Sequence, residues 1–209
     1  MLLAAQIWAS VTNVFLLLPI IVLACKDLVH VYSLEATWLT LLTVLSSLYH
    51  VCDPATELIW SCEGNRDSVS FTEDWVSTCG MICMVTPFVQ QVSPRVAAWV
   101  RIVLFPLAFA LLLVDPYEGE ITFAVLFFVL APLFVWAVRT VEPTSLDYRQ
   151  RWFVALLFAL VGFVLFGVAR YLFDEHSIAI ETHLWIHGAW HVPIAIAMAI
   201  VLSTLESGE

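Results

Sequence analysis

The sequence predicts an all-α protein, a bundle of seven transmembrane helices. Hydrophobic residues make up 62% of the 209 residues, only 12% are charged, and the mean hydropathy is +0.94. A soluble domain does not need so much apolar surface. Apolar runs of about 18 to 22 residues, enough to cross roughly 30 Å of hydrocarbon, recur along the chain. We expect one domain over residues 1–209, with helices at 3–25, 31–51, 75–92, 96–114, 121–138, 152–173 and 182–204.

The first predicted helix, residues 3–25, is expected to be retained rather than cleaved as a signal peptide. It has no basic segment before it and no clear small-residue cleavage site. Polar side chains also interrupt its apolar run, at Gln6, Ser10, Thr12 and Asn13.

The basic residues predict the orientation of the helices, because cytoplasmic loops carry an excess of Lys and Arg. With the N-terminus extracellular or lumenal and the C-terminus cytosolic, the outer side holds only Arg66 and Arg170. The inner side then holds the other six of the eight Lys and Arg residues: Lys26, Arg95, Arg101, Arg139, Arg149 and Arg151. This topology fits the plasma membrane or a membrane of the secretory pathway. The net charge of −10 argues against a nucleic-acid partner or a polybasic lipid-binding patch.

Two charged residues are expected near the inner membrane surface. Glu35 stands at the inner start of the second predicted helix, so its carboxylate is expected to reach the interface. Arg101 lies one turn inside the fourth predicted helix, and its long side chain can extend to the cytosolic headgroups.

Polar residues gather where the second and third predicted helices meet the outer surface. Ser46 and His50 lie one turn apart near the end of the second helix, within the stretch "SSLYHVCD". Asp74 precedes the third helix directly, in "TEDWVSTCG", at a similar depth. Ionisable groups inside a membrane are costly and usually face the bundle interior.

The seventh predicted helix begins at the same surface and carries His183, His187 and His191 at intervals of four, on one helix face. Two histidines spaced i, i+4 can chelate one metal ion from a single helix. A third, His50, would complete a three-histidine set whose fourth position stays open to water, as in catalytic zinc sites. The alternative is that these histidines are interfacial or hydrogen-bonded and hold no metal.

Three short motifs resemble those of the transmembrane-protein-8 and myomaker family: "SSLYHVCDP", "EDWVSTCG" and "HGAWHV". That family belongs to the CREST superfamily, with the alkaline ceramidases and the progestin and adiponectin receptors. The superfamily pattern is Ser-x3-His late in the second helix, Asp at the start of the third and His-x3-His in the seventh. The resemblance covers the whole seven-helix core.

The resemblance implies a role for each matching residue. His50, His187 and His191 would hold Zn²⁺, and Asp74 and Ser46 would contact the attacking water or its neighbours. His183 falls outside the pattern, so we interpret it as an interfacial histidine and an accessory candidate only.

The resemblance leaves the function open between classes. The leading hypothesis is zinc-dependent hydrolysis of a lipid amide or ester, as in the alkaline ceramidases, with a membrane lipid as partner. The alternative is a non-enzymatic membrane-remodelling or cell-fusion factor like myomaker, in which zinc only braces the bundle. A lipid-binding receptor is third. The chain ends in "STLESGE", without the cysteine-rich tail of myomaker. Whether it forms a homo-oligomer stays open.

Other seven-helix classes fit less well. A retinal protein needs a lysine in its last helix, and the only lysine of the chain is Lys26. A G-protein-coupled receptor usually has an acidic-Arg-Tyr motif at the inner end of its third helix, where this chain reads "FVQQVSPR".

A disulfide between Cys52 and Cys62 is predicted just beyond the outer end of the second helix. Under the predicted topology both cysteines face an oxidising compartment, where such bonds persist. The bond would hold the end of the helix that presents His50. With an inverted topology the two thiols would stay free.

Overall fold

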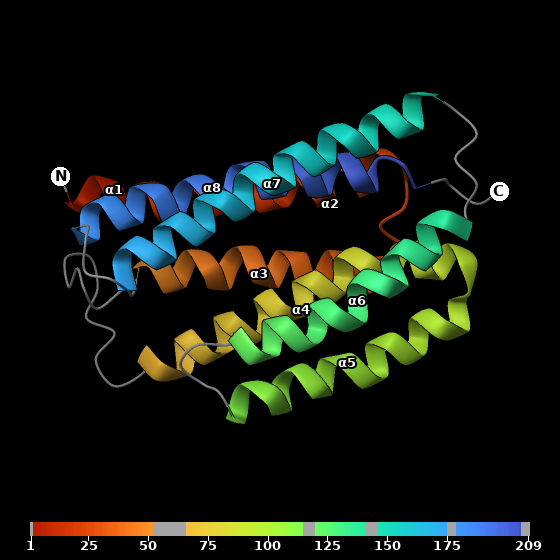
Figure 1. Cartoon of the computed structure of the whole chain (residues 1–209), viewed down its shortest axis with the longest axis horizontal. Coiled ribbons are helices and arrows are strands. Elements are labelled where there is room, and N and C mark those ends of the chain that lie inside the picture. Colours follow the sequence, from red (N-terminus) through yellow and green to blue (C-terminus); the bar gives the residue numbers. More distant parts are fainter. Residues whose placement is uncertain (1, 52–65, 115–119, 141–145, 175–178, 206–209) are drawn as a thin grey trace.

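The computed structural model describes residues 2–51, 66–114, 120–140, 146–174 and 179–205, and helices dominate every one of these segments (Figure 1). The described residues contain no strand, so the predicted all-α class is confirmed for them. The helices are α1 (Leu2–Thr12), η1 (Asn13–Leu17), α2 (Leu18–Cys25), α3 (Ser33–Val51), α4 (Arg66–Val92), α5 (Pro94–Val114), α6 (Glu120–Thr140), α7 (Leu146–Asp174) and α8 (Ile180–Leu202).

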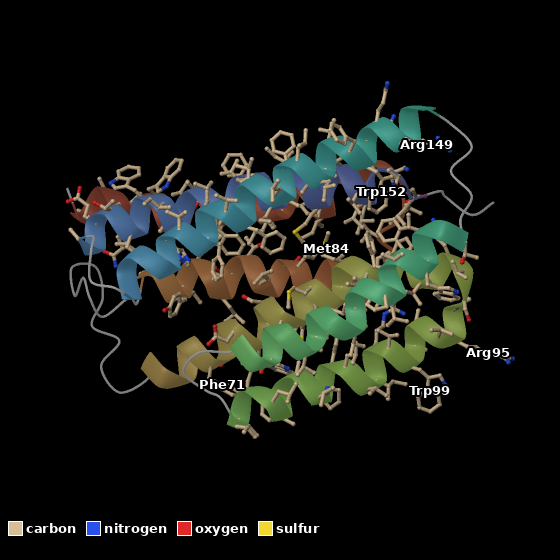
Figure 2. The ribbon with its side chains drawn as sticks, viewed as in Figure 1. Phe71, Met84, Arg95, Trp99, Arg149 and Trp152 are labelled. Carbon is tan, nitrogen blue, oxygen red and sulfur yellow. The ribbon has the colours of Figure 1, made fainter. Side chains whose placement is uncertain are left out.

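Four helical stretches are long and apolar enough to cross a membrane, which indicates a multi-pass membrane protein. They are Leu3–Cys25, Pro94–Val114, Arg149–Ala169 and Glu181–Leu202. Their outward side chains are apolar: Trp99 on α5 is 66% exposed and points away from the other helices (Figure 2). Apolar surface on this scale is normal where lipid is the solvent and unusual on a soluble monomer.

The first long helical stretch, Leu3–Cys25, is not α-helical throughout. Between α1 and α2, the η1 segment is a 3₁₀-helix, and Pro19 follows within the first turn of α2. Proline has no N–H to donate, and its ring crowds the carbonyl four residues earlier, so the preceding turn cannot keep regular α-helical bonding. The Asn13 side chain instead donates a hydrogen bond of 3.0 Å to the carbonyl oxygen of Ala9.

The helices pack in two groups that share the middle of the molecule. Helix α8 contacts α7, α1 and α2, whereas α4 contacts α3, α5 and α6, and Figure 1 shows these groups on opposite sides. Helix α3 joins the groups, because it contacts both α4 and the α1–η1 segment. The start of α1, the end of α3 and the start of α8 therefore lie at the same end of the bundle.

Two helices begin several residues earlier than the sequence predicted. Helix α4 begins at Arg66 rather than at residue 75, and α7 begins at Leu146 rather than at 152. An apolar run marks only the part of a helix that suits hydrocarbon, and backbone hydrogen bonding can continue into polar flanks such as "RDSVSFTED".

The expectation that Glu35 and Arg101 reach the membrane surface separately is wrong. Glu35 is 2% exposed, and the Arg101 guanidinium, 17% exposed, binds it from α5 (through Nε at 2.8 Å, and through Nη2). Thr86 Oγ1 donates to the same carboxylate at 2.7 Å, and Arg101 also donates to Gln90 at 2.7 Å. A buried carboxylate persists when a cation and further donors compensate its lost hydration, so burial is favoured here over snorkelling.

Candidate metal centre

His50 lies in the last turn of α3, where helix carbonyls have no intrahelical partner. The side chain of Gln6, fully buried in α1, supplies one. Its Nε2 donates to the carbonyl oxygens of His50, at 3.1 Å, and Val51, at 3.2 Å. Helix α1 thus holds the end of α3 that carries the imidazole of His50.

His187 and His191 are one turn apart on α8, and Gly188 beside them permits a close approach of α1. A methyl group at Gly188 would lie 2.9 Å from the Cα of Ala9 and 2.8 Å from Cδ1 of Trp8. Such distances are shorter than real carbon contacts, so this packing requires glycine. The close approach brings the first turns of α8 against the middle of α1.

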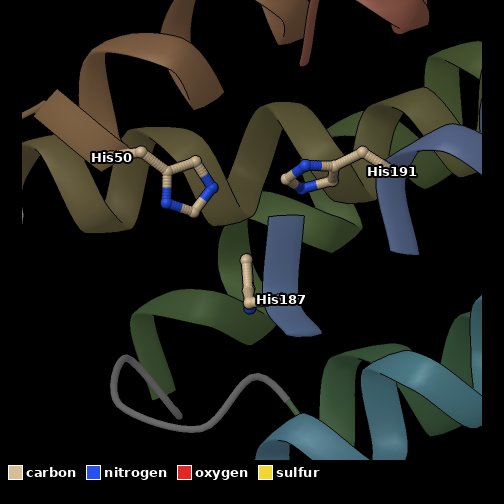
Figure 3. A group of neighbouring side chains, drawn as sticks. All are labelled: His50, His187 and His191. Atoms are coloured by element: carbon tan, nitrogen blue, oxygen red, sulfur yellow. The ribbon is translucent and has the colours of Figure 1, made fainter. Parts of the chain in front are cut away.

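The three imidazoles meet at this end of the bundle (Figure 3). One nitrogen of each ring, from His50, His187 and His191, lies within 4.8 Å of the other two. The ring centroids are 4.9 Å apart for His50 and His187, 5.5 Å for His50 and His191, and 5.4 Å for His187 and His191. His50 and His191 are buried and His187 is half-buried. These are the donor type and the convergence that a transition-metal site requires.

The ring nitrogens of the cluster differ in their hydrogen-bond partners. Nδ1 of His191 lies 3.2 Å from the hydroxyl oxygen of Thr12, so that nitrogen has a partner. Nδ1 of His50 is buried and has no hydrogen-bond partner among the described residues. A buried nitrogen without a hydrogen-bond partner is uncommon in native proteins unless an ion or a water satisfies it. The unpartnered nitrogen leaves room for an ion or a water, and the convergence of the three rings is what fits a metal ion.

Comparison with known protein families identifies the family of this chain. Residues 1–192 match the family described as "Protein of unknown function (DUF3522)". The chain belongs to this family. The matched segment extends past His191, so it includes all three histidines. A comparison with curated proteins finds no match.

In this DUF3522 member, aromatic rings flank the histidine cluster on α7 and α8. The ring of Trp190 lies 4.7 Å from that of His191, and Phe166 of α7 lies 5.2 Å from Trp190 and 6.5 Å from His187. His187 is the half-buried member of the set, and the rings of Phe166 and Trp190 lie beside it.

Ser46 and Asp74 lie at the depth of the cluster on neighbouring helices, and neither is one of the converging donors. Ser46 is buried in α3, one turn before His50. Asp74 is half-buried in α4. Gly80 packs on Leu42, and Thr86 donates to Glu35, so α3 and α4 run antiparallel. Six residues before Gly80, Asp74 therefore stands opposite the turn of α3 between Ser46 and His50.

His183 lies beside the cluster and outside it. Its ring centroid is 5.3 Å from that of His187. Its Nδ1 is 3.2 Å from the carbonyl oxygen of Ala169 on α7, and since a carbonyl can only accept, the imidazole donates there. This contact ties α8 to α7, which gives His183 a packing role.

The predicted disulfide between Cys52 and Cys62 falls within residues 52–65, outside the described residues, and stays a prediction. The described cysteines, Cys25, Cys79 and Cys83, are free thiols.

The sequence reasoning missed two residues that contact the ligand helices, Gln6 and Thr12. Both were noted as polar residues in an apolar helix. Their number is itself a signal, because a polar side chain inside a membrane helix usually has a partner on another helix.

Proposed function

We propose that this protein is a zinc-dependent hydrolase that cleaves an amide or ester bond of a membrane lipid. The observation that carries the proposal is the convergence of His50, His187 and His191 within a helical membrane protein. Three histidines leave one coordination position open, which distinguishes catalytic zinc sites from closed structural ones. The similarity of the motifs to those of the CREST superfamily supports the same reading.

Zinc, held by the three histidines, would supply Lewis-acid polarisation of the substrate carbonyl and activation of a water molecule. The remaining chemistry falls to neighbouring side chains. The carboxylate of Asp74 would accept the proton that the attacking water loses, and the Ser46 hydroxyl would donate a hydrogen bond that orients the reactants. The water oxygen bonds to the carbonyl carbon, and the C–N or C–O bond breaks. Asp74 then returns its proton to the leaving amine or alcohol.

A lipid is the substrate class that this position favours. The half-buried member of the cluster, His187, is flanked by the aromatic rings of Phe166 and Trp190. The outer face of α7 beyond them is apolar along its length, with Phe163 and Leu160 exposed. An acyl chain could therefore remain in the hydrocarbon while its amide or ester group reaches the metal.

We further propose that the protein crosses the membrane seven times. Helices α3, α4 and α6 would cross it in addition to the four most apolar stretches. Helices α3 and α4 carry polar side chains that face other helices, such as Glu35 and Thr86. This lowers their hydropathy while keeping their outer faces apolar. The N-terminus is then extracellular or lumenal, and the histidine cluster belongs to the outer leaflet.

The decisive variant is Asp74→Asn, which keeps the side-chain shape and removes the general base. Purified protein in lipid nanodiscs would be given amide-linked and ester-linked lipids, with released fatty acid and bound zinc both measured. We expect Asp74→Asn to keep its zinc and lose turnover by about 10²–10⁴-fold. Asp27→Asn is the matched control, because Asp27 is exposed and its positive φ of 55° tolerates asparagine.

Two outcomes would count against the proposal. Wild-type protein that binds zinc and cleaves none of the lipids would remove the hydrolase. Full activity of Asp74→Asn in a membrane-mixing assay, with zinc bound, would instead favour a scaffold that zinc braces.

A further inference from the structure

Helix α1 makes a direct hydrogen bond to one of the three histidines. The Thr12 hydroxyl oxygen lies 3.2 Å from Nδ1 of His191, and the two side chains are 1% and 2% exposed. Water does not compete for groups buried to this extent, so each depends on its protein partners.

The direction of this bond follows from the single hydrogen of a hydroxyl group. Thr12 Oγ1 also lies 3.0 Å from the carbonyl oxygen of Ala9, in hydrogen-bonding geometry. A carbonyl oxygen can only accept, so the Thr12 hydrogen points to Ala9. The lone pairs of Oγ1 then face His191, and the hydrogen between the two side chains must belong to Nδ1.

We propose that Thr12 is a positioning residue that holds His191 in its Nδ1–H tautomer and so presents the lone pair of Nε2 to the metal. A neutral imidazole carries one ring hydrogen, and the nitrogen without it is the one that can ligate. The bond also fixes the rotation of the ring. Partners of this kind orient metal-bound histidines generally. The inference rests on the metal site of the proposed function.

The local fold explains why Thr12 can act in this way. Thr12 is the residue directly before the 3₁₀ segment η1, and its backbone remains helical, with φ −63° and ψ −22°. Its hydroxyl therefore lies back along α1 toward Ala9. Gly188 lets α8 approach Ala9 closely, so His191, nearly one turn further along α8, meets the hydroxyl.

The test compares Thr12→Val, which keeps the shape and removes the hydroxyl, with Thr12→Ser, which keeps the hydroxyl. Zinc affinity would be measured on full-length protein by competition with a chelator. We expect Thr12→Val to weaken zinc binding about 10–100-fold and Thr12→Ser to stay close to wild type. Thr43→Val is the matched control. It removes another buried hydroxyl, which donates to the Leu39 carbonyl within its own helix at 2.9 Å, and it should leave the affinity unchanged.

A second readout uses metal-free protein labelled with ¹⁵N in its histidines, with the His191 signals assigned by their loss in His191→Gln. The wild type should show a protonated Nδ1 on His191, and Thr12→Val should show a mixture of tautomers. A purely structural role would lower the melting temperature of the variant without changing the tautomer.

The two proposals fail separately. Wild-type protein that binds zinc and shows the Nδ1–H tautomer but cleaves no lipid would remove the hydrolase and keep the role of Thr12, whereas wild-type protein that binds no zinc would overturn both. An Nε2–H tautomer in the wild type, or unchanged zinc affinity and tautomer in Thr12→Val, would overturn the role of Thr12.

Discussion

Replacing Arg101 with leucine should leave the buried carboxylate of Glu35 without its cationic partner. Glu35 is 2% exposed, and Arg101 approaches its Oε1 with two nitrogens. After the change, Thr86 would be the one remaining donor to that oxygen among the described residues, and Gln90 would lose its own contact with Arg101. Removing one partner of a buried pair destabilises a protein by about 3–5 kcal/mol, since the other charge is left uncompensated.

The size of this effect can be read as a melting temperature. For 150–250 residues, 1 kcal/mol shifts the midpoint by about 2–4 °C, so Arg101→Leu should melt about 6–20 °C lower than wild type. Thermal unfolding in detergent, followed by circular dichroism, would measure it. Arg95→Leu is the control, because Arg95 lies on the same helix and is exposed. It should change the midpoint little.

The double variant Glu35→Leu, Arg101→Leu gives the sharper comparison. Without either charge, no ion remains to be compensated, and exchanging a buried pair for apolar residues is often neutral or stabilising. The double variant should therefore be more stable than Arg101→Leu alone. The buried pair would be refuted if the double variant lost as much stability as the two single variants together. It would also be refuted if Arg101→Leu had the same melting temperature as the wild type.

Further predictions concern the metal centre and the outer loop. Purified protein should carry about one zinc per chain, and metal analysis should find it lost in His187→Ala and kept in the control His30→Ala, which changes an exposed histidine. Zinc should also dissociate in acid, because protonated imidazoles cannot ligate. Titration with a zinc-sensitive dye would show this, and release independent of pH would contradict histidine ligation. Gly188→Val should separate α1 from α8 and weaken zinc binding, whereas Gly167→Val, at a glycine whose added Cβ would meet no atom within 4 Å, should not. The Cys52–Cys62 bond, worth roughly 2–3 kcal/mol for a loop of about ten residues, would be detected by mass spectrometry of non-reduced peptides, and alkylation of both thiols in fresh protein would disprove it and the orientation with it.

The helical class and the meeting of three histidines were predictable from local residue spacing and from the order of the apolar runs. A spacing of four places His187 and His191 on one helix face. In the predicted topology, successive helices cross the membrane in opposite directions. The end of the second predicted helix then lies level with the start of the seventh, which places His50 at the depth of His187 and His191. The structure brings these three donors within 4.8 Å.

Other contacts between helices distant in sequence were not predictable in this way. Glu35 and Arg101 were assigned to the membrane surface by depth alone, since a hydropathy pattern does not reveal which face of α5 meets α3. Likewise, Thr12 reaches His191 only because Gly188 allows α1 and α8 to approach closely and because η1 follows Thr12. These are consequences of tertiary packing, which one sequence does not encode in any local period.

Helix α3 carries one residue of each of the two polar centres, the ion pair of Glu35 with Arg101 and the histidine cluster, and holds the two centres apart. Glu35 and His50 lie near its opposite ends, and 15 residues at about 1.5 Å each put them roughly 22 Å apart along the axis. One end is held by Arg101 of α5 and the other by Gln6 of α1. Sites this far apart, with no shared partner, usually act additively on stability. Loss of the ion pair should therefore lower the melting temperature and leave zinc affinity unchanged while the protein remains folded, whereas Thr12→Val should weaken zinc binding. If Arg101→Leu weakened zinc binding in folded protein, α3 would have to transmit strain between its ends, and the two centres would be coupled.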